Sequence, residues 1–517
     1  MRANASADPQ GAQKESVSRR FFSNTIVNYA GQGFILVLTF VTAPYTVHHL
    51  GPELYGILAL VQVTAGFAGL LNLGIGRALT KYVSELFWKG EFAEINRLFQ
   101  TAWSSCAMAG LLAMAALLGP RATIGRLFFR GGPNISGEVN FALFIAAFGL
   151  FTSMLLEAVS GLPSALQRFD IFNSVNVVSG TVRQVGPVIV LAMGYSIRSV
   201  LVVVLAGNML AVVAFALVSR KLIPGLSLVP KFNWPAFRKL FSFSLPLLLS
   251  TLFALIVARV DRFILAYYMP LAAVTFYTLP YSISEKASLG VANITSVVFP
   301  FTSELHSMGD HGKVHELYLR STKILMLVTM PITAILVAVP GLILRYWLGP
   351  EYAVQGAFTL AVLGIATLLN AMSAVPTVTS LGVGEAWMPA MYAFGSSVIN
   401  LVSNFVLIPR YGINGAAVAS LLAQAVIVPP FVYQTTRMIK FSLWEILTHG
   451  VMRPLLCASA QFAFLFVFRR YADSLMSLAL LCIVSLGVYG LISVFVGITK
   501  EERTALFRIP VLRPSQS

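Results

Sequence analysis

The stretch Arg259-Val260-Asp261-Arg262 places three ionisable residues inside the long apolar run 241–269. About 20 consecutive apolar residues span a bilayer as a helix, so this run predicts a transmembrane helix that is somewhat longer than needed. A charged side chain inside such a helix costs about 2.5–3.5 kcal/mol on insertion scales. Three ionisable residues together therefore indicate a polar cavity and not a lipid-facing surface.

The composition of the chain indicates an integral membrane protein. Of its 517 residues, 57% are hydrophobic and 11% are charged, against about 25% charged residues in a soluble domain. The net charge of +16 fits basic residues that face a cytoplasmic leaflet, so we expect a membrane and no nucleic acid as partner. The three cysteines show neither metal-ligand spacing nor a disulfide framework.

Fourteen apolar runs predict an all-α, polytopic fold of about fourteen transmembrane helices. The runs lie at 24–47, 54–75, 98–118, 139–162, 172–193, 200–218, 241–269, 275–300, 321–339, 357–381, 387–408, 416–433, 451–468 and 474–496. Of the 36 Lys and Arg residues, 24 fall on the side that holds the N-terminus, 8 on the opposite side and 4 deep within helices, when Lys323 and Arg453, each the third residue of its run, are counted with the preceding loops. The positive-inside rule therefore places both termini in the cytoplasm.

A weak internal repeat suggests two lobes. Tyr55 followed by 84–86 (SEL) parallels Tyr277 followed by 303–305 (SEL), and 195–197 (YSI) parallels 411–413 (YGI). Chance similarity in apolar sequence is the alternative. Six helices separate the copies, so both insert the same way up, and the lobes are related by a pseudo-twofold axis along the membrane normal with a site between them.

This organisation predicts six segments, which follow the chain in order. They are an N-terminal cytoplasmic tail (1–23), an N-lobe of six helices (24–219), a cytoplasmic linker (220–240), a C-lobe of six helices (241–434), two further helices (435–497) and a cytoplasmic tail (498–517).

Four motifs carry a resemblance to a known family. They are APYTVHHLGPELYG at 43–56 with LNLGIGRA at 71–78, then GLPSALQRF at 161–169, VDRFIL at 260–265, and Phe299-Pro300 through Glu304. In order and spacing the chain resembles the polysaccharide-biosynthesis flippases of the Wzx type, within the multidrug/oligosaccharidyl-lipid/polysaccharide (MATE-like) exporter superfamily. One departure is Asn72, where many members have Asp.

The resemblance implies a monomeric flippase that moves a polyprenyl-pyrophosphate-linked oligosaccharide across the bacterial inner membrane by alternating access, for O-antigen, capsule or exopolysaccharide synthesis. It also implies polysaccharide polymerase and glycosyltransferases of the same pathway as partners. We expect no cofactor and no enzymatic activity. The alternatives are a MATE-like small-molecule antiporter, which needs acidic residues to dominate its cavity, and a membrane polysaccharide polymerase or ligase.

An anionic pyrophosphate needs cations at depth, and Arg binds phosphate through two parallel hydrogen bonds. The candidate substrate-binding residues are Arg183, Arg259, Arg262, Lys286 and Arg77. Arg259 and Arg262 share one helix face at i and i+3. The alternative roles are structural ion pairs for the embedded cations and a membrane anchor for Arg77.

Three carboxylates are candidates for ion coupling: Glu157, Asp261 and Glu285. A carboxyl group inside a membrane can carry a proton, or it can pair with a neighbouring helix's cation, such as Arg183 for Glu157. His306, His311 and His315 fit a solvated loop better than a metal site, so we expect no metal. The sequence holds no phosphate-binding loop and no HExxH helix, and we assign no catalytic residue.

Overall fold

The computed structural model describes residues 9–66, 75–121, 123, 125, 133–288 and 290–497; side chains at 9–30, 77, 133–136, 243–258 and 293 lie outside the description. The regular elements of these ranges are all helices. Ten helical segments among them are long and apolar enough to cross a membrane. The predicted all-α fold of a multi-pass membrane protein is confirmed, whereas the count of fourteen spans stays a prediction.

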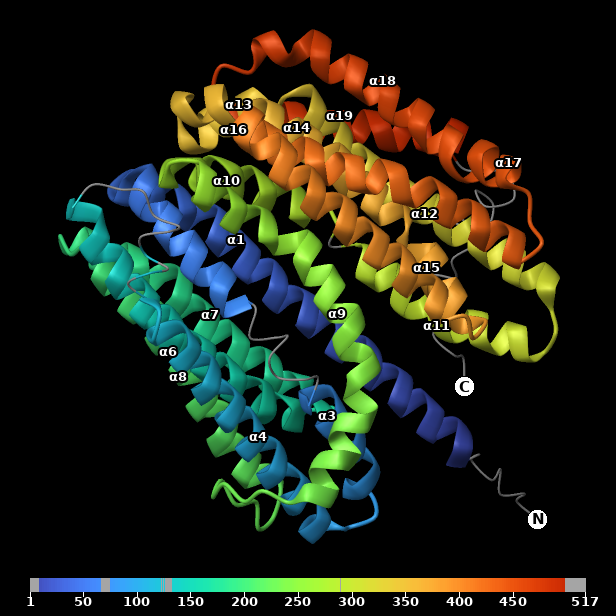
Figure 1. Ribbon diagram of the computed structural model, residues 1–517. Coiled ribbons are helices and arrows are strands. Elements are labelled where there is room, and N and C mark those ends of the chain that lie inside the picture. The colour runs from blue at the N-terminus through green and yellow to red at the C-terminus, as the bar shows by residue number, and fades with distance from the viewer. Residues whose placement is uncertain are drawn as a thin grey trace, which may run out of the picture. The chain divides into compact units, whose positions relative to one another are not determined.

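The chain divides into two compact units, Met1–Leu252 and Phe253–Ser517. In the first unit α7 packs against both α1 and α8, and α6 packs against α4 and α8 (Figure 1). Helix α9 begins in the first unit and ends in the second. The first unit's helices are α1 (Pro9–Gly66), α3 (Ile75–Phe87), α4 (Phe92–Leu118), α6 (Pro133–Ala165), α7 (Phe169–Ala192), α8 (Ile197–Leu222) and the start of α9 (Trp234–Tyr268).

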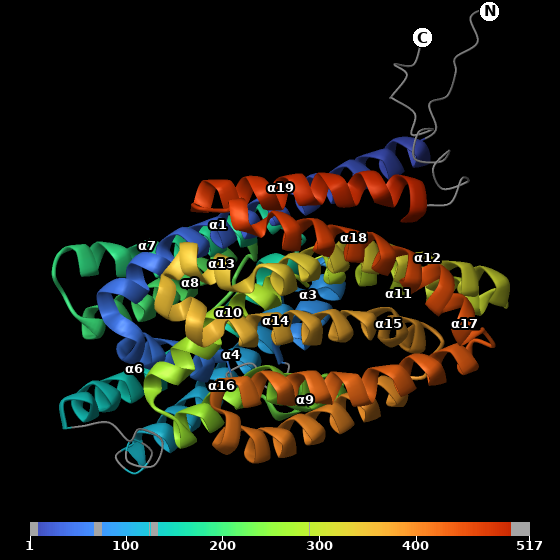
Figure 2. The ribbon, with the colours of Figure 1, turned by 90° about the horizontal axis from the view of Figure 1, so that it is seen from above.

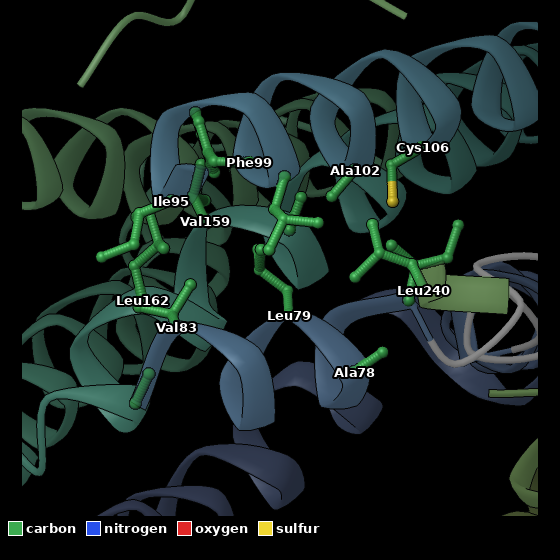
Figure 3. Close-up of a cluster of buried hydrophobic side chains, with 14 of the residues drawn as sticks. Ala78, Leu79, Val83, Ile95, Phe99, Ala102, Cys106, Val159, Leu162 and Leu240 are labelled. Atoms are coloured by element: carbon green, nitrogen blue, oxygen red, sulfur yellow. The ribbon is translucent and has the colours of Figure 1, made fainter. Parts of the chain in front are cut away.

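A buried apolar cluster joins α3, α4 and α6 in this unit. Leu79 of α3, Phe99 of α4 and Leu162 of α6 are fully buried within it (Figure 3). In α3 the apolar residues recur at helical spacing and Lys81 and Glu85 are exposed, so one face of this amphipathic helix is buried in the unit. The cluster fixes α3 against α6, which carries Glu157.

The second unit contains the remaining helices. Helix α14 packs on α10, α12 and α16, and α18 runs along α12 (Figure 2). The elements are α10 (Leu271–Lys286), α11 (Val291–Ser307), α12 (His311–Ala338), α13 (Pro340–Leu348), α14 (Pro350–Met372), α15 (Ala374–Gly382), α16 (Trp387–Met438), α17 (Leu443–Glu445), the π-helix η1 (Ile446–Met452), α18 (Arg453–Phe468), the 3₁₀-helix η2 (Arg469–Tyr471), α19 (Leu475–Ile492) and the π-helix η3 (Ser493–Gly497).

Two of the longest helical segments each contain one non-helical glycine. Helix α16 has 52 residues, which at 1.5 Å per residue would be about 78 Å, more than twice the thickness of a hydrocarbon core of about 30 Å. It breaks at Gly412 (φ 56°, ψ −132°), and α1 breaks at Gly51 (φ 73°, ψ 167°). Both glycines lie between runs that the sequence predicts as separate helices. Each segment is therefore a pair of legs joined at a glycine that tolerates positive φ.

The eighth predicted run, 275–300, is interrupted in the structure. Helix α10 ends at Lys286 and α11 begins at Val291. The intervening residues include Ser288 and Gly290, and such pairs are a common cause of a break in a membrane helix. Glu285 and Lys286 thus stand at the end of a helix and not in the middle of one.

Candidate functional site

Arg183 of α7 lines a cavity of about 280 Å³ in the first unit. Its Nη1 donates a hydrogen bond to Oδ1 of Asn208 in α8 at 3.2 Å. Gln62, Ser153 and Gln184 supply further polar groups to the cavity. Among the described residues that line it, Arg183 is the one with a charge, so the cavity presents a single cation together with neutral hydrogen-bonding groups and apolar side chains.

Glycines at the crossing of α7 and α8 make room for this arginine. A Cβ atom on Gly207 of α8 would lie 2.7 Å from Cγ of Arg183. A Cβ atom on Gly186 of α7 would lie 2.3 Å from a methyl carbon of Val203 in α8. The two helices therefore approach closely, and the stem of Arg183 lies in the space that a larger residue at 207 would fill.

Glu157 of α6 lies against α3 in the same unit. A Cβ atom on Gly76 would lie 2.8 Å from Cγ of Glu157 and 2.9 Å from its Oε1. Nearby, the hydroxyl of Thr80 donates to the carbonyl oxygens of Gly76 at 2.9 Å and Gly161 at 3.2 Å, which ties α3 to α6. Glu157 is outside the set of described residues that line the Arg183 cavity. The side chain of Arg77, also proposed from the sequence, lies outside the described residues.

In the second unit, two charged residues of α9 meet two tyrosines of α10. Asp261, fully buried, accepts a hydrogen bond from the backbone N–H of Arg262 at 2.8 Å and another from the hydroxyl of Tyr277. The guanidinium of Arg262, 4% exposed, lies 4.2 Å from the centre of the Tyr281 ring. Tyr277 and Tyr281 are one turn apart, so a single face of α10 contacts both the acid and the cation.

The other candidates of this unit are more accessible than Asp261 and Arg262. Arg259 is half-buried, and Lys286 is exposed at the end of α10. Glu285 is exposed as well, and it lines a second cavity of about 380 Å³ together with Tyr281. Tyr281 is therefore in contact with Arg262 and also forms part of the wall of this cavity.

The neutral residues of the second cavity are absent from the residues predicted from the sequence. Its polar lining comes mainly from hydroxyl and amide side chains on α14 and α16, among them Thr367, Asn370, Ser396, Ser420 and Gln424. Spacing offers a signal, because Ser396 follows Tyr392, and Gln424 follows Ser420, at one helical turn within apolar sequence. Charge alone cannot reveal such a site.

The two legs of α16 face each other through amides and hydroxyls. The side-chain amide of Asn400 donates to the hydroxyl of Ser420 at 3.4 Å, and that of Gln424 donates to the hydroxyl of Ser396 at 3.5 Å. Asn404, fully buried, donates to Oδ1 of Asn400 at 3.0 Å. These polar contacts lie beside the cavity, since Ser396, Ser420 and Gln424 also line it.

The three histidines expected in a solvated loop lie in helices instead, His306 in α11 and His311 and His315 in α12. Nε2 of His315 is hydrogen-bonded to the carbonyl oxygen of Ile439, and its ring packs on Phe441, 5.1 Å between centres. Within the described part of the chain, no group of three or more His, Cys, Asp and Glu side chains is placed to hold a metal ion.

A family model and two relatives match more than half of the chain in sequence. The model described as "Polysaccharide biosynthesis protein" matches residues 21–306. A Shigella flexneri protein named "Putative O-antigen transporter" is 22% identical over 403 residues, which are 77% of this chain and 93% of the relative. A Haloferax volcanii protein named "Probable low-salt glycan biosynthesis flippase Agl15" is 22% identical over 402 residues, 78% of this chain and 79% of the relative.

Solved structures share the fold at low sequence identity. A structure titled "Lipid II flippase MurJ, inward closed conformation" superposes with a TM-score of 0.70 at 16% identity, covering 91% of this chain and 98% of the other. An inward-facing multidrug resistance transporter of the MATE family gives a TM-score of 0.64 at 14% identity, covering 78% and 96%. At these identities the comparison establishes the fold alone.

Proposed function

The chain belongs to the polysaccharide biosynthesis protein family, and from this membership we propose that it is a flippase for a lipid-linked oligosaccharide. The relatives' names, an O-antigen transporter and a glycan biosynthesis flippase, support this substrate class. The finer proposal is a polyprenyl-pyrophosphate carrier lipid, moved from the inner to the outer leaflet of a bacterial inner membrane by alternating access. O-antigen, capsule or exopolysaccharide synthesis would use the product.

The observation that carries the proposal is Arg183 in its cavity. A cation inside a membrane protein is costly unless a partner or a polar cavity compensates. The described hydrogen bond of Arg183 goes to the neutral amide of Asn208, and no described residue that lines the cavity is acidic. The guanidinium thus keeps its full positive charge available for an anionic ligand. A pyrophosphate fits it because two phosphate oxygens can accept parallel hydrogen bonds from one guanidinium.

The remaining charged candidates keep the roles proposed from the sequence. Arg77, Arg259, Arg262 and Lys286 stay proposed as substrate-binding residues. Arg262 is nearly buried beneath Tyr281, so its contribution would come through the electrostatic field more than through direct contact. Glu157, Asp261 and Glu285 are proposed for ion coupling. Of these, Asp261 already accepts two hydrogen bonds, whereas Glu157 lies at the interface of α3 and α6.

Reconstitution of the purified protein tests the proposal. Vesicles are prepared with a fluorescent polyprenyl-pyrophosphate oligosaccharide, and the probe in the outer leaflet is quenched by a reagent that does not cross the bilayer. We expect the inner-leaflet probe to become quenchable over time only in vesicles that contain the protein. Transport of a small cationic dye with no movement of the lipid probe would refute the proposal in favour of an antiporter.

A further inference from the structure

The cavity of the second unit has the chemistry of a sugar-binding site. Its volume of about 380 Å³ is within the range of about 300–1,000 Å³ for small-molecule sites. Hydroxyl and amide side chains dominate its polar lining. Each of these groups can donate and accept a hydrogen bond, as each hydroxyl of a sugar can, so the two sets are complementary.

Aromatic rings form part of the wall. The rings of Tyr392 and Phe431 lie 4.7 Å apart between centres, and both line the cavity. The hydroxyl of Tyr392 donates to Oε1 of Gln434 at 2.6 Å, which fixes the orientation of its ring. The face of an aromatic ring carries partial negative charge, and the C–H groups on one face of a pyranose carry partial positive charge, so the two stack favourably.

The charge of the lining is negative. Glu285 is the one charged residue among the described residues that line the cavity. Two cations of this unit, Arg262 and Lys286, are outside the set of described residues that line the cavity: Arg262 is nearly buried against the ring of Tyr281, and Lys286 is exposed at the end of α10. The carboxylate of Glu285 would therefore repel a sugar that carries a carboxylate, and it would not repel an uncharged sugar.

We infer that this cavity is a subsite for an uncharged pyranose of the transported oligosaccharide and that Glu285 selects against uronic acids. The inference rests on the proposed function and adds a specificity to it. The hydroxyl and amide groups would bind the sugar hydroxyls, and Tyr392 and Phe431 would support a ring face.

The test compares two radiolabelled polyprenyl-pyrophosphate disaccharides that differ at one carbon. One ends in glucose and the other in glucuronic acid, and each is titrated against the full-length protein in lipid nanodiscs. Because opposed like charges are strongly unfavourable, we expect the neutral probe to bind at least about tenfold more tightly. Glu285→Gln should raise the affinity for the acidic probe to within about threefold of the neutral one, as the repulsion is removed. The matched control is Glu304→Gln, which removes an exposed carboxylate outside the cavity.

A second variant tests the hydrogen-bonding wall. Gln424→Leu should weaken binding of the neutral probe by about three- to tenfold, which corresponds to the loss of a net hydrogen bond. Its control is Gln461→Leu, because Gln461 is also a buried glutamine that donates to a serine hydroxyl, Ser485 at 3.2 Å, but it does not line the cavity.

The outcomes separate the subsite from the proposed function. Equal binding of both probes, no binding of the neutral probe, or an unchanged preference in Glu285→Gln would overturn the subsite. Flux of the neutral probe that is the same in Gln424→Leu and wild type would also overturn it while the flippase assignment stands. Selective binding of the neutral probe without any translocation would refute the flippase assignment and leave the subsite in place.

Discussion

Arg183 is the residue that most directly supports the proposal of an anionic substrate. Its insertion carries a cost of about 2.5–3.5 kcal/mol on translocon scales, and one hydrogen bond to a neutral amide offsets only part of that cost. The close approach of α8 at Gly207 holds the stem of the side chain in place. A rigidly held cation in a polar cavity favours a ligand-binding role over a role in joining helices.

A series of substitutions at Arg183 separates these two roles. Because hydrogen bonds to charged groups contribute about 1.5–3 kcal/mol, Arg183→Ala should reduce flux about 10- to 100-fold in the vesicle assay. Arg183→Lys keeps the charge without the planar fork and should reduce flux partly. Arg183→Gln should resemble Ala if the charge binds substrate, and wild type if the residue only bonds α7 to α8.

The control for this series is Arg198→Ala, which removes an exposed arginine paired with Glu138 in the same unit. It should leave flux unchanged. Normal flux in Arg183→Ala at a normal protein level would show that this residue does not hold the substrate.

Glu157 yields a second prediction. If its carboxyl group carries a proton during transport, Glu157→Gln should lower gradient-driven flux at least about tenfold while the protein level in the membrane is unchanged. Glu138→Gln, at an exposed ion pair, is the control. Poor insertion or degradation of Glu157→Gln would instead assign the carboxylate to the packing of α3 on α6.

Sequence reasoning identified the charged residues of both units because each charge inside an apolar run is costly and therefore conspicuous. Arg183, Glu157 and Asp261 were found in this way, although their roles stay predictions. The neutral lining of the second cavity could not be predicted, because Ser396, Ser420 and similar residues carry a low free-energy cost of insertion into a membrane. Such residues are also common where two membrane helices pack together, so their presence in the sequence does not indicate a cavity. Only the fold brings the two legs of α16 together and shows that these side chains share one cavity.

The kink of α16 shows how one residue determines the path of a helix. Gly412 has positive φ, and a Cβ atom on it would lie 3.0 Å from Cε of Met269. Gly412→Ala should therefore lower the stability of the protein in detergent by about 1–3 kcal/mol, measured from the midpoint of thermal denaturation. Gly490→Ala in α19 is the matched control, since a Cβ atom there has nothing within 4 Å. An unchanged midpoint for Gly412→Ala would mean that the break between the two legs of α16 does not require a glycine at position 412.

Hydropathy predicts which segments are helical, but it does not predict whether each helix runs without a break. The run 241–269 corresponds to α9, which begins at Trp234, while 275–300 is divided between α10 and α11. Hydropathy averages over many residues, so it does not register the short break between α10 and α11, where apolar residues continue on both sides. The position of Lys286 at a helix end follows from such a break.

The distribution of basic residues between the predicted loops predicts the topology of the chain. With 24 of the 36 Lys and Arg residues on one side, both termini should be cytoplasmic. A phosphatase that is active only outside the cytoplasm, fused after Ser517, should give no signal. The same enzyme fused after Tyr195, in a loop predicted to be external, should give a strong one. Activity of the first fusion would require an odd number of spans and would contradict the two-lobe organisation.

The hairpin of α16 restricts which insertions and deletions the chain can accept. Asn400 and Ser420 lie equally far in sequence from Arg410, and so do Ser396 and Gln424. Adding one residue to a single leg would rotate every later side chain of that leg by about 100°, because an α-helix has 3.6 residues per turn. The amides would then lose their hydroxyl partners along the whole length of the pair. Homologues that share these pairs should therefore vary in length at the hairpin's outer ends and not between position 396 and position 424.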